Sequence, residues 1–424
     1  MPPIPASPPE SGVGEHAAQA LSVEDARRRL IDEVTPVSGA ETVALRSALG
    51  RVLAADIHSP IDVPAHTNSA MDGYALRADD LPASGSVSLR VIGSALAGAP
   101  FQGAVNAGEC LRIMTGAPLP VGTDTVVMQE QVQRQGEHAS FGAGHRRGEN
   151  VRAAGEDLAR GQLAFAAGRC VQPADLGLLA SLGRAEVRVT RRLRVAFFST
   201  GDELRSVGET LAEGQIYDSN RYTLYGMLTR LGVEIVDMGV VRDDPAALRR
   251  AFIEAADAAD AIITSGGVSV GEADYVKETL DALGEIRFWQ VAMKPGRPLA
   301  FGRVRGAAFF GLPGNPVSVM VTFYQFVEPA LRRMMGQSDT RPAAATFKVR
   351  CVSRLHKRAG RTEFQRGILE WDAAGELVVR ATGQQGSGVL RSMSAANCFV
   401  ILPRDSVTVE PGTLVDVQPF HGIL

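Results

Sequence analysis

The spacing of apolar residues predicts an α/β domain between residues 193 and 337. Short apolar runs, typical of buried strands, alternate there with longer segments whose apolar residues recur every three or four positions, as in a helix. The expected strands are 194–199, 233–237, 261–264, 286–291 and 307–311, and the expected helices are 219–231, 245–258, 273–283 and 317–334. Because such alternation is typical of a parallel sheet with right-handed crossovers, we predict a three-layer parallel-sheet domain.

The pattern differs on the N-terminal side of this domain. Residues 1–20 hold five prolines together with Ser, Gly and Glu, which predicts a disordered lead. Ser22 and Asp25 then have the spacing of a capping box at the start of a helix, and a second helix is expected at residues 41–54. We expect a helical linker domain built from two segments, residues 21–57 and 167–192.

Two further regions have a β-rich texture, in which short apolar runs alternate with clusters of Gly and Pro. They are residues 58–166 and residues 341–424, and the expected strands of the second are 346–352, 377–381, 398–402 and 413–418. The predicted fold class is therefore multidomain α/β plus β-rich. It combines N-terminal α+β and β-rich regions, the central three-layer α/β domain and a C-terminal β-barrel or sandwich.

Composition narrows the class of protein. The chain has 424 residues, of which 45% are hydrophobic and 21% charged, and a formal charge of −3. This balance gives no support for binding to nucleic acid or a membrane surface, so any anion site must be built locally. The four cysteines lie far apart without a CxxC pair, which disfavours a zinc or iron–sulfur site and favours a reduced, cytoplasmic setting. No apolar run is long enough to predict a membrane span.

Polar and glycine-rich segments follow four of the expected strands. In a parallel sheet these strand ends lie at one edge, where ligands of open α/β sheets bind. The segments supply Glu203 after the first strand, Asp243 and Asp244 after the second, Ser265, Gly266, Gly267, Ser269 and Gly271 after the third, and Pro313, Gly314 and Asn315 after the last. This convergence is a stronger signal than any of the motifs alone.

The glycine-rich segment at residues 265–271 can bring backbone N–H groups close to an anion, because glycine permits positive φ and has no side chain in the way. A helix follows, and its N-terminus adds partial positive charge. The alternative is a plain strand-to-helix turn. The turn at residues 313–315 also opens a helix, so it predicts either anion recognition or tight packing.

The carboxylates of Asp243 and Asp274 could hold a Mg²⁺ ion that bridges phosphate oxygens. The alternative for Asp243 or Asp244 is to cap the helix that starts with Pro245, a favoured position for Asp. Asp274 and Glu203 could equally be solvated. Lys294 and Arg297 flank a Pro-Gly turn, as in an oxyanion clamp or an ordinary surface turn.

Further candidates lie in the β-rich regions. Asp72 belongs to an Asp-Gly turn, a common hairpin signal, and Thr115 follows a strand that runs into a turn. Arg366 and Ser392 lie on expected loops and could bind phosphate or form polar turns. None of the seven histidines has metal-ligand spacing.

These segments, in this order, resemble the bacterial molybdopterin molybdenumtransferase family, which is related to the E domain of animal gephyrin and to its plant equivalent. The resemblance spans the chain from about residue 21 to its end. The residues that carry it are 68–75, 112–118, 198–204, 241–245, 264–277, 294–298, 311–316 and 361–367. Each motif is modest, but their combination is highly specific.

The resemblance implies an elongated homodimer of four-domain subunits, with each site between the α/β domain of one subunit and the N-terminal β-rich domain of the other. It implies that adenylylated molybdopterin and molybdate bind, that AMP is released in a metal-dependent step, and that molybdenum enters the pterin dithiolene. An upstream adenylyltransferase is an implied partner.

By the same resemblance, Asp243 and Asp274 would hold or orient Mg²⁺. Lys294 and the Pro-Gly-Asn turn would contact anionic groups, while Asp72, Thr115 and Glu203 would position substrate or molybdate.

The chain departs from the family pattern at one point. Relatives often carry a lysine where this chain has Gln290, four residues before Lys294. Either that charge is dispensable, or Arg287 or Arg297 replaces it. Two alternative functions are the adenylyltransferase, which resembles the α/β domain alone, and a gephyrin-like scaffold, which would not need Asp72, Asp243 and Asp274 together.

Overall fold

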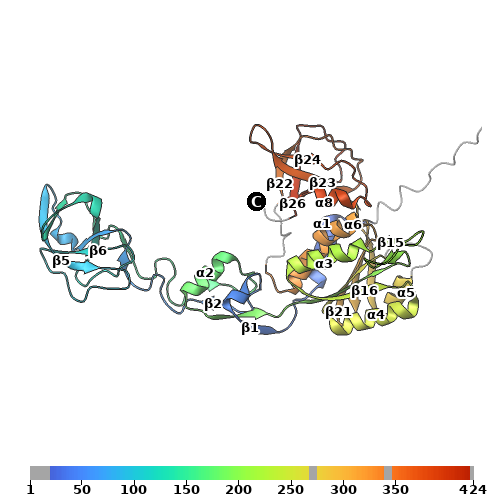
Figure 1. Cartoon of the computed structure of the whole chain (residues 1–424), viewed down its shortest axis with the longest axis horizontal. Helices are drawn as coiled ribbons and strands as arrows, with labels where there is room; N and C mark the ends of the chain where they lie inside the picture. Colours follow the sequence, from blue (N-terminus) through green and yellow to red (C-terminus); the bar gives the residue numbers. More distant parts are fainter. Residues whose placement is uncertain (1–19, 267–274, 339–345, 421–424) are drawn as a thin grey trace, which may run out of the picture.

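The chain folds into an elongated molecule, seen here in a computed structural model that describes residues 20–266, 275–338 and 346–420. A β-rich domain lies at one end, a narrow linker domain in the middle, and the α/β domain with the C-terminal barrel at the other end (Figure 1). Within the described ranges, no helix has the length and apolar character needed to cross a membrane.

The α/β domain contains a six-stranded sheet in the order β16-β13-β17-β21-β20-β18. Its first four strands are parallel, as expected, and the last two are antiparallel to their neighbours. The strands are β13 (Arg194–Thr200), β16 (Glu234–Val241), β17 (Ala261–Ser265), β18 (Gly284–Gln290), β20 (Pro298–Val304) and β21 (Ala307–Leu312). β20, which begins directly after the Pro-Gly turn, was not among the expected strands.

Helices cover both faces of this sheet and confirm the three-layer prediction. Apolar residues of α4 (Pro245–Ala258) and α5 (Tyr275–Leu283) form one buried cluster against the sheet. On the other face, α1 (Val23–Glu33), α3 (Ser219–Leu231) and α6 (Pro316–Thr322) share a larger cluster with the sheet. A π-helical turn (Phe323–Val327) and α7 (Glu328–Met334) continue α6.

The linker domain is built from two chain segments, and α1, which precedes the first of them, packs against the α/β sheet instead. Ser22 caps α1, since its hydroxyl accepts a hydrogen bond from the Asp25 N–H at 3.0 Å, which confirms the predicted helix start. The helix expected at residues 41–54 is wrong: β1 (Ala40–Ala44) and a 3₁₀ turn (Leu45–Ala48) occupy its first half. β1 pairs with β12 (Glu186–Thr190), and this pairing outweighs the local helical spacing. The α2 helix (Pro173–Ser181) packs beside the 3₁₀ turn.

The distal β-rich domain is a six-stranded sheet in the order β7-β4-β6-β5-β9-β8. Separate apolar clusters cover its two faces, one around Tyr74 and Phe141, the other around Ala75 and Leu111. The strands are β4 (Gly73–Leu76), β5 (Ser86–Ala95), β6 (Glu109–Ile113), β7 (Thr125–Met128), β8 (Val132–Gln135) and β9 (His138–Gly142), and short pairs join β2 (Ile57–His58) to β11 (Leu163–Phe165) and β3 (Asn68–Ser69) to β10 (Val151–Arg152).

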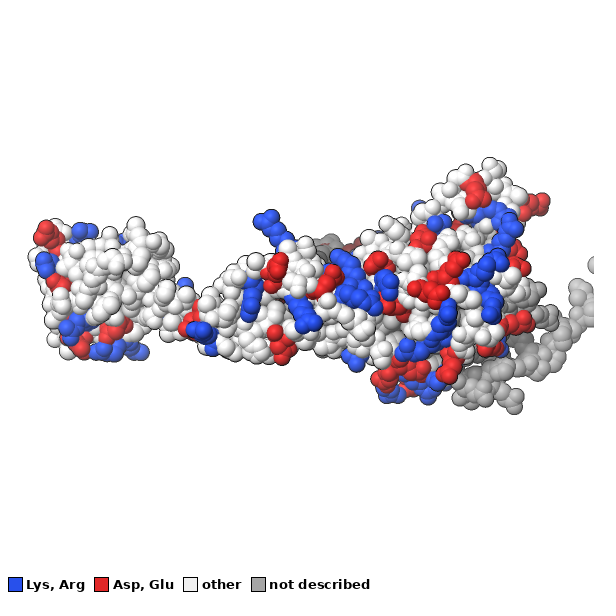
Figure 2. Space-filling view, turned by 90° about the horizontal axis from the view of Figure 1, so that it is seen from below, with Lys and Arg blue, Asp and Glu red and all other residues white. Residues whose placement is uncertain are grey.

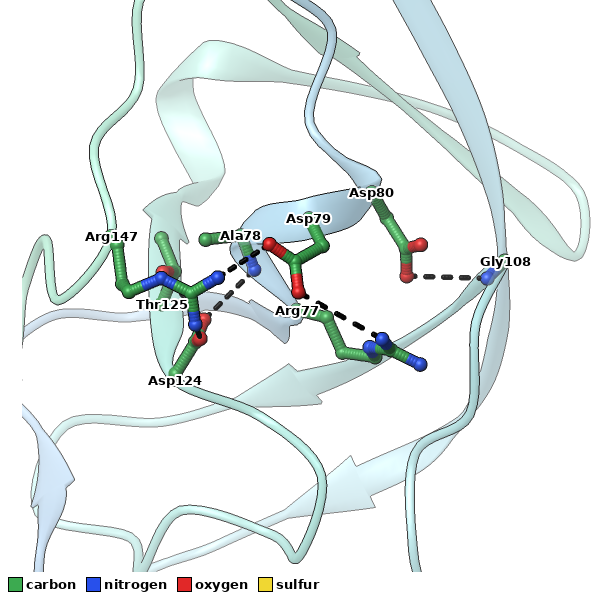
Figure 3. Close-up of polar contacts among 8 residues, drawn as sticks. All are labelled: Arg77, Ala78, Asp79, Asp80, Gly108, Asp124, Thr125 and Arg147. Carbon is green, nitrogen blue, oxygen red and sulfur yellow. Dashed lines mark hydrogen bonds and ion pairs between the residues drawn. The ribbon is translucent and has the colours of Figure 1, made fainter.

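An ion-pair network fixes the turn that follows β4 (Figure 3). Arg147 contacts both Asp79 and Asp124, and Asp124 accepts a hydrogen bond from the Ala78 N–H at 2.8 Å. Asp80 accepts another from the Gly108 N–H at 3.2 Å. The network lies at the opposite end of β4 from Asp72 and ties the turn to the neighbouring loops.

The C-terminal domain is a closed barrel of five strands, in which β23 pairs with both β24 and β25 and so completes the ring. Its strands are β22 (Phe347–Cys351), β23 (Thr362–Trp371), β24 (Leu377–Ala381), β25 (Cys398–Leu402) and β26 (Leu414–Pro419), and the short helix α8 (Leu390–Ala395) precedes β25. The barrel prediction is confirmed, but residues 361–367 were expected to form a loop. They enter β23, because Phe364 packs into the core shared with the α/β domain.

Candidate active site

Four parallel strands end side by side at one edge of the central sheet, as the sequence predicts. Glu203, Asp243 and Pro313 follow β13, β16 and β21, Ser265 ends β17, and these four strands are neighbours in the sheet. The Asp243 N–H lies 3.4 Å from an Asp202 carboxylate oxygen, so the loops after β13 and β16 are in contact. The described part of the strand-end site therefore forms a single cluster.

Gly266 occupies a position that excludes any other residue. Its φ is +94°, and an added Cβ would lie 2.6 Å from the Thr200 carbonyl oxygen, which is far inside van der Waals contact. Its N–H donates to the Leu312 carbonyl at 3.1 Å, so this turn links three strand ends. The predicted anion-binding residues Gly267, Ser269 and Gly271 lie outside the described residues, as does Asp274, the second predicted Mg²⁺ ligand.

Asn220, a residue that the sequence analysis missed, joins the loops after β17 and β21. Its amide nitrogen donates to the Ser265 hydroxyl at 2.8 Å and to the Gly314 carbonyl at 2.7 Å. The shielded Oδ1 of Asn220 and Oδ2 of Asp218 have no partner within the described part of the chain. Since buried polar atoms are usually paired, these two oxygens are available to a ligand or water. Both residues could have been identified from the sequence by their position at the start of the predicted helix α3, of which Asp218 is the N-cap.

The two neighbouring aspartates after β16, Asp243 and Asp244, have different roles. Asp244 caps α4, with its carboxylate accepting from the Ala247 N–H at 2.8 Å. Asp243 takes no part in the cap. Burial raises the pKa of Asp243, and the charges of Asp202 and Glu203 raise it further. Three carboxylates thus concentrate negative charge here, although the described residues alone contain no group of three acidic, histidine or cysteine ligands with metal-site geometry.

An open cavity of about 690 Å³ adjoins this acidic cluster. Its lining includes Asp202, Arg205, Arg221, Arg242 and Asp243. The Arg221 guanidinium is paired with Asp237 at 2.8 Å. On the face shown in Figure 2, basic and acidic side chains are likewise interleaved over this end of the molecule. The described surface shown at this end of the molecule is therefore not uniformly basic, and an anion site must rely on individual basic side chains.

Lys294 lies between β18 and β20 in the chain, on the short strand β19 (Met293–Lys294), which pairs with β23 of the barrel. Its side chain is 50% exposed, and its ammonium lies 3.5 Å from Glu363 of the barrel. Arg297 is exposed and Gln290 ends β18. Arg287, one of the proposed replacements for a lysine at position 290, is instead paired with Glu33 at 2.7 Å.

Arg366 and Ser392 meet, but not on loops as expected. Arg366 lies in the middle of β23 and is 1% exposed, and Ser392 lies in α8. The guanidinium donates to the Ser392 hydroxyl and to the Gly386 carbonyl, both at 3.0 Å. Burial lowers the pKa of Arg366 to about 10, and no ion pair with a described carboxylate compensates for it. The loop that contains Gly386 also contacts α6, because the Val317 N–H donates to the carbonyl of the next loop residue, Ser387, at 3.1 Å.

Asp72 and Thr115 form a second, separate cluster. The backbone N–H and the hydroxyl of Thr115 donate to one Asp72 carboxylate oxygen at 2.7 and 2.8 Å. Both bonds lower the pKa of Asp72, and the bond from the backbone N–H has the larger effect. Both residues belong to the domain marked by β5 and β6 in Figure 1. This domain lies at the opposite end of the folded molecule from β16 and β21. A single chain therefore does not bring them to the strand-end site.

Comparisons with known proteins cover nearly the whole chain. Residues 21–183 match the MoeA N-terminal region (domain I and II), residues 196–333 a probable molybdopterin binding domain, and residues 348–420 the MoeA C-terminal region (domain IV). The molybdopterin molybdenumtransferase of Haemophilus influenzae is 42% identical over 405 residues, which are 95% of this chain and 100% of that protein.

Other relatives agree. Molybdopterin molybdenumtransferase 2 of Mycobacterium tuberculosis is 37% identical over 92% of this chain and 97% of its own length. A crystal structure of the molybdopterin biosynthesis moeA protein from Pyrococcus horikoshii superimposes with a TM-score of 0.82 at 28% identity, covering 95% of this chain and 100% of that one. Because three family models match successive regions and a relative at 42% identity covers 95% of the chain, this chain belongs to the molybdopterin molybdenumtransferase family.

Proposed function

We propose that this chain inserts molybdenum into molybdopterin, the reaction for which its relatives are named. The observation that carries the proposal is the convergence of four strand ends in a domain that matches a molybdopterin binding domain. This edge combines carboxylates and backbone N–H groups, and Lys294 is the cation proposed to act with them. A phosphorylated pterin and an oxyanion need these kinds of groups.

The proposed substrate is adenylylated molybdopterin, whose adenylate link is hydrolysed to release AMP. Asn220 and the tight Gly266 turn fix the backbone beside Gly314, so N–H groups of this edge can face phosphate oxygens without rearrangement. A preorganised site of this kind stabilises the charge that develops on the oxygens as the anhydride breaks.

The donor set at Asp243 fits a Mg²⁺ ion. Its carboxylate is not used for capping, and its raised pKa reflects burial beside Asp202 and Glu203. A divalent cation would relieve this repulsion, with Asp274 as the second proposed ligand and water or phosphate oxygens as the others. When bound, Mg²⁺ supplies polarisation of the phosphoryl oxygens, while Glu203 positions the substrate.

Molybdate is proposed to bind between the α/β domain and the barrel. Lys294 offers a half-exposed ammonium there, and Arg366 contributes a buried positive charge that no described carboxylate neutralises. In a poorly solvated setting such a charge attracts an oxyanion more strongly than it would in water. Ser392 and the loop that Arg366 holds complete this region, and Arg297 is the remaining candidate for the charge that Gln290 lacks.

A second copy of the chain is proposed to supply Asp72 and Thr115. Their distance from the strand-end site within one chain supports this arrangement. Tyr222 and Tyr225 leave half of their surface exposed on α3, next to Asn220. The middle of the distal β-rich domain is free of charged side chains on the face shown in Figure 2. Large aromatic residues and few charges are typical of protein interfaces.

We also propose that the enzyme works in the cytoplasm, which its four unpaired cysteines support. An upstream adenylyltransferase would deliver its substrate.

The direct test is turnover of adenylylated molybdopterin by the purified protein. AMP and molybdenum cofactor should form only with molybdate and Mg²⁺ present, and chelation of the metal should stop the reaction. If the folded, dimeric protein binds substrate but yields neither product, the proposal is wrong. Formation of the adenylylated compound from ATP would instead indicate the adenylyltransferase.

A further inference from the structure

The backbone around Lys294 is fixed between two domains. β19 runs parallel to the start of β23, with Lys294 opposite Glu363. Two residues further on, Gly296 has a φ of +93°, and an added Cβ would lie 2.7 Å from the Thr322 hydroxyl of α6. The barrel and α6 therefore set where the lysine side chain begins. They do not set where its flexible four-carbon stem ends.

Glu363 is a buried carboxylate at the position where that stem can be held. The residue is 5% exposed, and one of its carboxylate oxygens lies 3.5 Å from the Lys294 ammonium. The other accepts a hydrogen bond from the Gln365 amide at 3.1 Å, and Gln365 also donates to the His356 carbonyl at 3.0 Å. Glu363 is thus anchored from the barrel side. A buried carboxylate of this kind is strongly destabilised if its cationic partner is removed.

A second lysine near Glu363 cannot serve as the ligand-binding group. Lys357 is 6% exposed, and its ammonium donates to the backbone carbonyls of Arg358, Arg404 and Ser406 at 3.2, 3.2 and 2.9 Å. Burial lowers the pKa of Lys357, and the charge of Glu363 opposes this effect. All three of its N–H donors are used inside the barrel. Lys294, by contrast, uses one donor for Glu363, and its other two have no partner among the described residues.

We propose that Glu363 is a positioning residue that holds the Lys294 ammonium toward the oxyanion region. The proposal rests on the function of Lys294 proposed above. An anchored ammonium has fewer orientations to lose when an anion binds, since long lysine side chains otherwise lose considerable rotamer freedom. The carboxylate lies on the barrel side of Lys294, so the remaining donors can face the α/β edge.

The test compares Glu363→Gln, Lys294→Gln and the double variant in molybdate-dependent cofactor formation. Glu363→Gln should raise the KM for molybdate by about 5- to 10-fold and change kcat less than about twofold, because a charge-assisted contact to the lysine is lost. In the Lys294→Gln background the same change should have no further effect on KM, since residues that act through one contact are not additive. Glu363→Asp keeps the charge and should recover much of the loss.

The matched control is Glu370→Gln on the same strand, where the carboxylate pairs with Arg380 on the barrel surface. It should leave KM unchanged. If Glu363→Gln does not fold, Gln365→Leu loosens the carboxylate without removing its charge and should raise KM about twofold.

Three results would overturn the inference: a KM for Glu363→Gln equal to or below that of the wild type, the full effect persisting in the Lys294→Gln background, or no recovery in Glu363→Asp. A different result, in which Lys294→Gln itself binds molybdate normally, would remove Lys294 from the proposed function and the inference with it.

Discussion

Asp72 and Asp243 are both predicted site carboxylates, but their environments in the folded chain are opposite. Asp72 accepts two hydrogen bonds from Thr115, which lower its pKa, so this carboxylate is stabilised as an anion before any ligand arrives. Burial raises the pKa of Asp243, and the charges of Asp202 and Glu203 raise it further, so its surroundings oppose its negative charge. The distal carboxylate is thus held by hydrogen bonds within the chain, whereas the strand-end cluster is the place where we propose that a metal binds.

The two environments also give opposite pH effects on stability. A lowered pKa means that Asp72 stabilises the fold above the pKa it has when unfolded, and that this contribution is lost as the pH falls through its folded pKa. A raised pKa means that the folded protein binds the Asp243 proton more tightly than the unfolded chain does. The free energy of unfolding of the metal-free protein therefore falls as the pH rises from the unfolded pKa of Asp243 to its higher folded pKa.

The largest expected effect comes from removing the Asp243 charge. Asp243→Asn should lower turnover by about 100-fold or more, since it removes a proposed metal ligand. It should also raise the free energy of unfolding of the metal-free protein by up to about 0.5 kcal/mol, because the opposed charge is gone. Asp244→Asn is the matched control: Asn also caps helices well, so both quantities should stay unchanged. Normal turnover of Asp243→Asn would remove this residue from the metal site.

The next effect concerns the buried guanidinium of Arg366. Arg366→Met should weaken molybdate binding by about 10-fold or more, because the unneutralised charge of the barrel is lost. Molybdate should raise the Tm of the wild type and have little effect on the Tm of the variant. The control is Arg380→Met, an exposed barrel arginine paired with Glu370. An equal molybdate-induced rise in Tm in all three proteins would contradict the proposed oxyanion site.

A smaller effect is expected at the distal cluster. Thr115→Val keeps the backbone hydrogen bond to Asp72 and removes the one from the hydroxyl. Turnover should fall by about fivefold to tenfold, and the acid limb of the pH–rate profile should move to higher pH as the pKa of Asp72 rises. Thr123→Val, which loses only a bond to the Pro120 carbonyl in the same domain, should leave the profile in place.

The smallest effect should come from Gln290→Lys. A lysine at the exposed end of β18 adds one solvent-screened positive charge near Lys294, so the KM for molybdate should fall by about twofold to threefold. Gln290→Met supplies a similar length without charge and should change nothing. An unchanged KM for the lysine variant would show that the charge is already supplied, for example by Arg297.

The sequence predicted the strand-end site because its signals are local. Apolar runs ending in glycine and carboxylates identify strands and their polar ends, and parallel topology brings those ends together. β23 was missed for the opposite reason: its buried polar residues, Glu363, Gln365 and Arg366, hide the usual alternation. The partners of these residues, Ser392 for Arg366 and Lys294 for Glu363, lie far away in the sequence, so the sequence pattern alone does not reveal the contacts. The helix expected at residues 41–54 failed because β1 finds its partner, β12, some 140 residues away.

The most direct test of the two-part site mixes subunits. Asp72→Asn and Asp243→Asn chains should each be inactive as homodimers. When they are mixed and allowed to exchange, each mixed dimer regains one intact site, so molybdate-dependent cofactor formation should recover to about a quarter of the wild-type rate. Recovery at that level would place Asp72 and Asp243 in one site shared between copies. No recovery, despite mixed dimers being detected, would contradict that arrangement.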